Sequence, residues 1–101
     1  MNITKIETTD DIFEGSCLQG YVRTSYNNLK NIFGLPSDII SGDNKVNTEW
    51  SVNFTLDNGD EIKATIYDWK ENSTPTDEYD WHVGGYNVDA VECVARVLED
   101  Q

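Results

Sequence analysis

The residues best suited to bind a ligand lie in two short segments, at positions 66–70 and 81–85. The first segment reads Ile-Tyr-Asp-Trp-Lys and the second reads Trp-His-Val-Gly-Gly. Aromatic rings offer flat faces for stacking, basic side chains donate hydrogen bonds, and a Gly-Gly step lets the backbone approach a ligand without interference from a Cβ atom. This combination suits a purine, a ribose, or one or two phosphates.

The predicted ligand site combines these two segments with one basic residue from an earlier strand. Its members are Arg23, Tyr67, Asp68, Trp69, Lys70, Trp81, His82, Gly84 and Gly85. The tryptophans would stack on the ligand, and the arginine, lysine and histidine would donate hydrogen bonds. A helix that begins after the glycines would add free N–H groups at its N-terminus. A simpler interpretation also fits, in which Trp81 belongs to the core and Gly84-Gly85 is only a turn.

Catalytic and metal-binding chemistry has few candidates in this sequence. His82 is the only histidine, and the acidic groups at 57–60 and 77–80 do not follow the spacing of a calcium loop. Cys17 or Cys93 could pair with His82, but neither cysteine lies in a recognisable nucleophile motif. We therefore expect no catalytic centre, no metal and no cofactor.

The elements that would position the site are clearest in the middle of the chain. Apolar and polar residues alternate over Val46–Leu56, which predicts a strand with one buried face and one solvent-exposed face. Asn58-Gly59 is typical of a tight hairpin turn, and Glu61–Trp69 is the expected return strand. Shorter strands are predicted at Gly20–Thr24 and Tyr79–Val83, and residues 37–45 are predicted to form a loop.

Two segments have the periodicity of amphipathic helices. The first begins at Thr24 or Ser25, either of which can cap it, and ends at Gly34 before a proline. The second covers Val88–Glu99, where apolar residues recur at helical spacing. We expect an α+β domain, with an antiparallel meander of about four strands and both helices on one face. Residues 1–16 show only weak patterning, and one domain is expected to span residues 1–101.

Composition narrows the classes of partner. The chain has 19 acidic and 7 basic residues, for a net charge of −12. Binding to nucleic acid or to an anionic membrane needs clustered Lys and Arg, so neither partner is expected. No apolar run approaches the roughly 18 residues of a membrane span, and the first residues lack the apolar segment of a signal peptide. We expect a soluble, intracellular protein with two reduced cysteines.

Four ordered motifs resemble a widespread family of small phage and prophage proteins, usually labelled hypothetical. They are Tyr-x-x-Leu-x-x-x-Phe-Gly-x-Pro at 26–36, Glu-Trp-x-Val-x-Phe at 49–54, Ala-Thr-Ile-Tyr-Asp-Trp-Lys at 64–70, and Trp-His-Val-Gly-Gly at 81–85. The resemblance covers residues 20–98 and implies a phage accessory protein in the bacterial host cytoplasm. Small phage proteins of this kind often counter host defence.

Two functions follow from these observations. In the first, which is the function that the sequence favours, the protein is not an enzyme and sequesters a nucleotide-derived host immune signal in the predicted site. In the second, the acidic surface inhibits a basic host protein, such as a nuclease or CRISPR-type effector, in part by mimicking nucleic acid. A homo-oligomer is also possible, because the wet face that carries Lys63, Thr65 and Tyr67 could form a two-fold interface.

Overall fold

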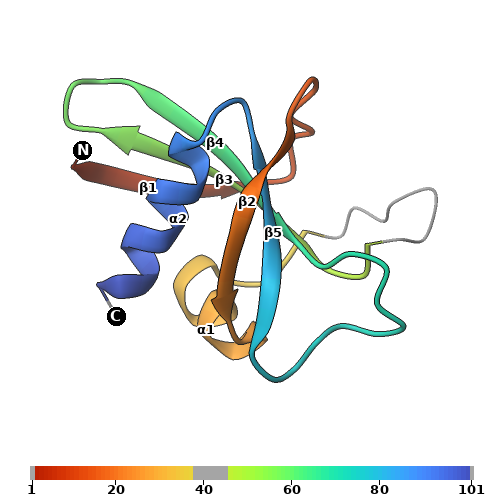
Figure 1. The fold of residues 1–101 in the computed structure, drawn as a ribbon. Helices are drawn as coiled ribbons and strands as arrows, with labels where there is room; N and C mark the ends of the chain where they lie inside the picture. Colours follow the sequence, from red (N-terminus) through yellow and green to blue (C-terminus); the bar gives the residue numbers. More distant parts are fainter. Residues whose placement is uncertain (1, 38–45, 101) are drawn as a thin grey trace.

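The computed structural model describes residues 2–37 and 46–100, which form one antiparallel sheet and two helices (Figure 1). The predicted loop at 37–45 falls outside the described residues from position 38 onward. The elements, in chain order, are β1 (Ile3–Thr9), β2 (Cys17–Thr24), α1 (Tyr26–Phe33), β3 (Glu49–Leu56), β4 (Glu61–Tyr67), β5 (Tyr79–Gly85) and α2 (Asp89–Glu99). The α+β class predicted from the sequence is confirmed.

The order of strands across the sheet is β1-β3-β4-β5-β2, and every neighbouring pair is antiparallel. Strands β3, β4 and β5 form the predicted meander. Strands β1 and β2 are consecutive in the chain but lie at opposite edges of the sheet. Residues 10–16, which connect them, therefore have to pass over the three central strands, and we call these residues the crossing segment.

One face of the sheet carries the hydrophobic core. Trp50, Val52 and Phe54 project from β3 into a cluster that also contains residues of both helices, and all three side chains are at most 1% exposed. The Phe33 ring of α1 lies 6.3 Å from the Phe54 ring, in an edge-to-face arrangement. The alternation read from the sequence thus placed the correct side of β3 inward, and both helices cover that side.

Local sequence signals account for the bounds of α1. The Ser25 side chain accepts a hydrogen bond from the Asn28 N–H, which caps the N-terminus. Gly34 adopts a φ of +84°, a conformation that glycine reaches at low cost, and its N–H donates to the Lys30 carbonyl. The Trp50 indole N–H then donates to the Gly34 carbonyl at 2.9 Å, which ties the end of the helix to β3.

The sheet has one strand more than the roughly four that the sequence predicted. The additional strand is β1, in the segment where patterning is weak. It is an edge strand, and five of its seven residues are exposed, so burial imposes little alternation on it. Strand β5 also continues through Gly84 and Gly85, so these glycines belong to a strand and not to a turn before α2. No helix in the described part of the chain has the length and apolar character needed to cross a membrane.

Candidate functional site

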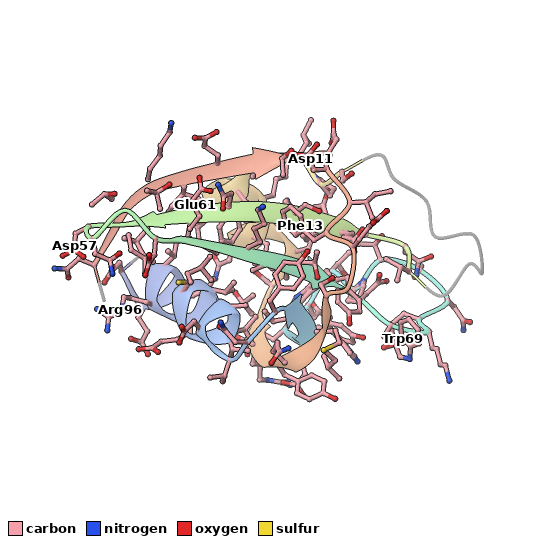
Figure 2. The ribbon with its side chains drawn as sticks, turned by 90° about the horizontal axis from the view of Figure 1, so that it is seen from above. Asp11, Phe13, Asp57, Glu61, Trp69 and Arg96 are labelled. Carbon is pink, nitrogen blue, oxygen red and sulfur yellow. The ribbon has the colours of Figure 1, made fainter. Side chains whose placement is uncertain are left out.

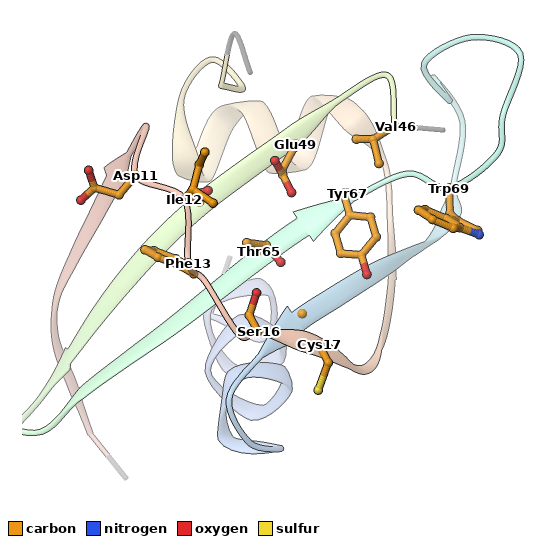
Figure 3. A pocket seen from close by; sticks show the side chains of 12 residues that line it. Asp11, Ile12, Phe13, Ser16, Cys17, Val46, Glu49, Thr65, Tyr67 and Trp69 are labelled. Carbon is orange, nitrogen blue, oxygen red and sulfur yellow. The ribbon is translucent and has the colours of Figure 1, made fainter. Parts of the chain in front are cut away.

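A pocket of about 320 Å³ lies on the face of the sheet opposite the helices (Figure 3). Its floor consists of side chains from β3, β4 and β5, and the crossing segment forms one wall. Figure 2 shows the crossing segment, with Asp11 and Phe13 labelled, on the side of the sheet away from α2. The volume is at the lower end of the range for small-ligand pockets, about 300–1,000 Å³.

The floor is hollow because three small residues align across three strands. Ser51 pairs with Thr65, and Thr65 pairs with Gly84. A Cβ atom at Gly84 would lie only 2.5 Å from the Thr65 hydroxyl oxygen, so the backbone at Gly84 needs glycine to keep this spacing. The missing side chain leaves space above the middle of the sheet.

A second row of paired residues borders the hollow and is much larger. Glu49 pairs with Tyr67, Tyr67 with His82, and His82 with Tyr21. Figure 3 shows the Glu49 carboxylate and the Tyr67 ring over the sheet, with Trp69 farther out on the same side. The pocket therefore has a floor of small polar residues and a border that is aromatic and acidic.

The crossing segment closes the opposite side. Phe13 is 9% exposed, although it lies on the polar face of the sheet, and Ser16 also lines the pocket. The Tyr86 hydroxyl donates to the Glu14 carbonyl at 2.7 Å, and Gly15 turns with a φ of +78°. This anchoring holds Phe13 over the strands and gives the pocket a fixed apolar wall.

The polar side chains inside the pocket have unused hydrogen-bonding capacity. Ser51 and Thr65 are only 3% and 8% exposed, yet neither hydroxyl has a side-chain hydrogen bond within residues 2–37 and 46–100. The Glu49 carboxylate likewise has no ion pair or hydrogen bond with the described residues. None of these oxygens belongs to the fully buried side-chain atoms without a partner among the described residues, which are Asn53 Oδ1 and His82 Nδ1, so they face the open space of the pocket and are accessible to a ligand.

Burial shifts the pKa values of the two titratable groups on the border, Glu49 and Tyr67, upward. Desolvation raises the pKa of Glu49 above its usual value of 4.5. The pKa of Tyr67 is also raised, first by burial and then by the nearby Glu49 charge, so its hydroxyl stays protonated at neutral pH. No Lys, Arg or His side chain lines the pocket among the described residues. The charges of the described lining residues therefore favour a cation over a phosphate.

Three of the predicted site residues line the pocket, and two lie beside it. Tyr67, Trp69 and Gly84 contribute directly. His82 belongs to the bordering row but does not line the pocket, and its ring lies 5.3 Å from Tyr67 and 6.2 Å from Trp69. Desolvation lowers the pKa of His82, which favours the neutral imidazole. Lys70, at a φ of +57°, places its ammonium group 5.9 Å from the Trp69 ring.

Trp81 and Gly85 do not meet a ligand at this site, contrary to the sequence prediction. Trp81 is fully buried on the helix face, and its indole N–H donates to the Thr24 carbonyl. A Cβ atom at Gly85 would lie 2.6 Å from the Ala90 Cβ of α2. Successive strand residues face opposite sides of a sheet, so Gly84 faces the pocket and Gly85 faces α2. The N-terminus of α2 therefore lies on the far side of the sheet from the pocket.

Asp68 and Arg23 also lie away from the pocket. The Asp68 carboxylate is fully buried and accepts hydrogen bonds from the backbone N–H groups of Asn47 and Thr48, and from the Asn47 side chain, at 2.8–3.0 Å. It anchors the chain before β3. Arg23 is exposed and forms ion pairs with Glu78 and Asp80. Neither side chain is positioned to bind the same ligand as Trp69.

Sequence reasoning missed Glu49, Ser51, Thr65 and the crossing segment. The first three occupy the polar side of the predicted strands, which was expected to be wet. Phe13, an aromatic residue in a polar stretch, was the one signal that the N-terminal segment covers something. The path of that segment depends on the positions of β1 and β2, which alternation does not reveal.

The structure separates one of the two cysteine–histidine pairs that the sequence offered, because Cys93 and His82 lie on opposite faces of the sheet, whereas Cys17 lines the pocket. Cys93 is buried on the helix face, where desolvation raises the pKa of its thiol to about 11, whereas His82 lies on the other face. Within the described residues, no cluster of three or more His, Cys, Asp or Glu side chains could hold a metal ion.

Comparison with protein families, curated proteins and solved structures found no match to this chain.

Proposed function

We propose that this chain is a non-enzymatic binding protein that acts on a basic protein partner through the polar face of its sheet. The observation that carries the proposal is the charge of the pocket, which contains an unpaired carboxylate and no basic side chain among its described lining residues. Among these described residues a nucleotide phosphate would meet no counter-charge, whereas a cationic group would meet Glu49.

The surface around the pocket is also negatively charged. Asp10, Asp11 and Glu14 of the crossing segment are exposed, and residues 10–16 include no basic residue. In Figure 3 the Asp11 carboxylate points outward, away from the pocket centre, where it is available to a partner. The Lys63 ammonium group lies 5.8 Å from the Phe13 ring of this segment. With a net charge of −12, the molecule attracts a basic surface at long range.

The resemblance to small phage proteins suggests the kind of partner. A host nuclease or CRISPR-type effector has a basic groove for nucleic acid, and an acidic protein could occupy that groove. The proposed function is therefore inhibition of such a protein by direct contact, as part of phage counter-defence.

The proposal is tested by measuring binding to purified bacterial nucleases and CRISPR effectors by biolayer interferometry. The variant Asp10→Asn, Asp11→Asn, Glu14→Gln removes three charges next to the pocket. Each exposed ion pair contributes about 0.2–1 kcal/mol, so the triple change should weaken binding roughly tenfold. Binding should also weaken steeply between 50 and 300 mM NaCl, because the attraction is screened.

The matched control removes the same amount of charge from α2 and its C-terminal end, with Glu92→Gln, Glu99→Gln and Asp100→Asn. These residues belong to the other face of the sheet, so this variant should retain binding to within about threefold. Equal losses in the two variants would show that only net charge matters. The absence of salt-sensitive binding to every basic protein in the panel would contradict the proposed function.

Nucleotide sequestration remains a second candidate, favoured by one observation. Trp69 is 37% exposed, its ring lies beside Lys70, and His82 is close by, so a base could stack and a phosphate could pair outside the pocket. Calorimetry with cyclic dinucleotides and ADP-ribose tests this function. Binding that is lost in Lys70→Ala and retained in the crossing-segment variant would favour sequestration over inhibition of a basic protein.

A further inference from the structure

We infer that the pocket is a receptor for one arginine side chain of the partner. This inference rests on the proposed function, because it specifies how the acidic face recognises a basic protein. It assigns Glu49 as the counter-charge, Tyr67 and Trp69 as the aromatic wall, and Ser51 and Thr65 as additional hydrogen-bond acceptors.

Glu49 supplies a charge that no described residue pairs with. Its carboxylate lies at the pocket border, half-buried and without an ion pair or hydrogen bond in the described part of the chain. Holding an unpaired carboxylate in a partly desolvated position costs free energy, and a cation would recover that cost. Asp11, the other acidic residue that lines the pocket, points outward and is placed to guide the approach.

The hydroxyl groups on the floor can accept hydrogen bonds from the guanidinium N–H groups that a carboxylate leaves unpaired. This group has five N–H donors in one plane, of which a carboxylate can accept two. Ser51 and Thr65 are more than nine-tenths buried, point into the pocket, and have no side-chain hydrogen bond among the described residues. Both can accept the N–H groups that Glu49 leaves unpaired.

The shape and the walls favour arginine over lysine. A planar guanidinium stacks on aromatic faces, and Tyr67 and Trp69 stand along one side of the space, with their ring centroids 6.3 Å apart. Phe13 on the opposite side offers an apolar surface to the aliphatic stem. A lysine ammonium would pair with Glu49 but would leave most of the floor acceptors unsatisfied, because it has only three donors at a single point.

The experiment titrates ¹⁵N-labelled protein with the peptide acetyl-Gly-Arg-Gly-amide and follows amide and indole signals by NMR. The matched probe replaces arginine with citrulline, which has nearly the same shape and no charge. We expect the arginine peptide to shift the Thr65 and Gly84 amides and the Trp69 indole signal. Its affinity should exceed that of the citrulline peptide by about tenfold or more, as for a hydrogen bond to a charged group. The lysine peptide should bind with intermediate affinity.

Two matched variants localise the effect. Glu49→Gln should weaken arginine binding at least about tenfold, whereas Glu61→Gln, an exposed glutamate on the adjacent β4, should change it less than about twofold. Equal affinity for arginine and citrulline, shifts outside the pocket, or equal effects of the two variants would overturn the inference. So would a lysine peptide that binds as tightly as the arginine peptide.

The same variants separate this inference from the proposed function. If basic proteins bind with the expected salt dependence and Glu49→Gln leaves that binding unchanged, the acidic face acts without an arginine pocket and only the inference fails. If the arginine peptide binds in the pocket but no basic protein binds, the pocket stands as a cation site and the proposed function fails.

Discussion

At the scale of single residues, the adjacent glycines of β5 have opposite surroundings. Gly85 lies against Ala90 of α2, and a methyl group there would also approach the Lys63 carbonyl at 3.0 Å. We expect Gly85→Ala to lower the free energy of unfolding by about 1–3 kcal/mol, because the helix has to move away from the sheet. Urea denaturation measures this change.

Gly84 allows a sharper test, because the atom closest to a Cβ at this position is a single side-chain oxygen that a second substitution can remove. The Cβ atom of Gly84→Ala would clash with the Thr65 hydroxyl, and Thr65→Ala removes that hydroxyl. The double variant should therefore be more stable than the sum of the single changes predicts, by about 0.5–3 kcal/mol. Additive effects would mean that Thr65 is not what requires glycine at position 84.

The tryptophans of the two motifs should differ in their contribution to stability. Trp81 is fully buried, so Trp81→Ala should cost about 3–5 kcal/mol of unfolding free energy. Trp69 is 37% exposed at the pocket border, and Trp69→Ala should cost about 1 kcal/mol. Urea denaturation of both variants tests this difference, and similar losses would contradict the placement of Trp81 in the core and Trp69 at the surface.

Glu49 should make stability depend on pH. Its pKa is raised in the folded protein by desolvation, so the unfolded chain loses this proton first as the pH rises. Stability should fall as the pH rises above 4.5 and then level off once folded Glu49 has also ionised. Glu49→Gln lacks this penalty. Its melting temperature should exceed that of the wild type at pH 7, and the difference should shrink toward pH 4. A less stable Glu49→Gln at pH 7 would show that the carboxylate has a stabilising partner.

At the scale of elements, the sequence predicted what short-range patterns control. The alternation of apolar and polar residues predicted β3, and the Asn-Gly turn predicted the hairpin. A serine at the N-cap and a glycine after the last turn predicted the two ends of α1. The order β1-β3-β4-β5-β2 depends on which edges pair, and no short-range pattern encodes it. The pocket depends on that order, because the crossing segment passes over the polar face only when β1 and β2 occupy opposite edges. Tyr67, Trp69 and Gly84 were found because their chemistry is visible locally, whereas Ser51 and Thr65 were not.

The register of β3 can be tested on its two faces. Val52 is fully buried, so Val52→Asp should unfold the domain by placing an unpaired carboxylate in the core. Ser51 is not a suitable neutral control, because it is 3% exposed beneath the crossing segment. Thr55 is a better one, since it is half-buried on the polar face and pairs with Lys5 of β1 on one side and Glu61 of β4 on the other, so an aspartate there would meet charges of both signs. We expect Thr55→Asp to change the melting temperature little, and comparable losses in both variants would contradict the register.

At the scale of the whole molecule, charge and fold oppose each other. Folding gathers 19 acidic and 7 basic residues into a small volume, and the acidic residues of the crossing segment lie over a sheet face that already contains Glu49. Self-repulsion of this kind destabilises the compact state. A protein that binds a basic partner gains affinity from the same charges, so the partner should stabilise the fold as well as bind to it.

The balance between repulsion and folding should appear as a dependence of stability on salt. The Debye length falls from about 30 Å at 0.01 M salt to about 3 Å at 1 M, so NaCl screens the repulsion. We expect the melting temperature at pH 7 to rise by several degrees between 10 and 500 mM NaCl, since about 1 kcal/mol corresponds to roughly 4–8 °C in a domain of this size. The variant that neutralises Asp10, Asp11 and Glu14 should show a smaller rise, because fewer acidic residues repel one another on that face. Near pH 4.1, the isoelectric point of the sequence, the rise should largely disappear. An equal rise at both pH values would mean that salt acts by another route and that repulsion does not limit the stability of this fold.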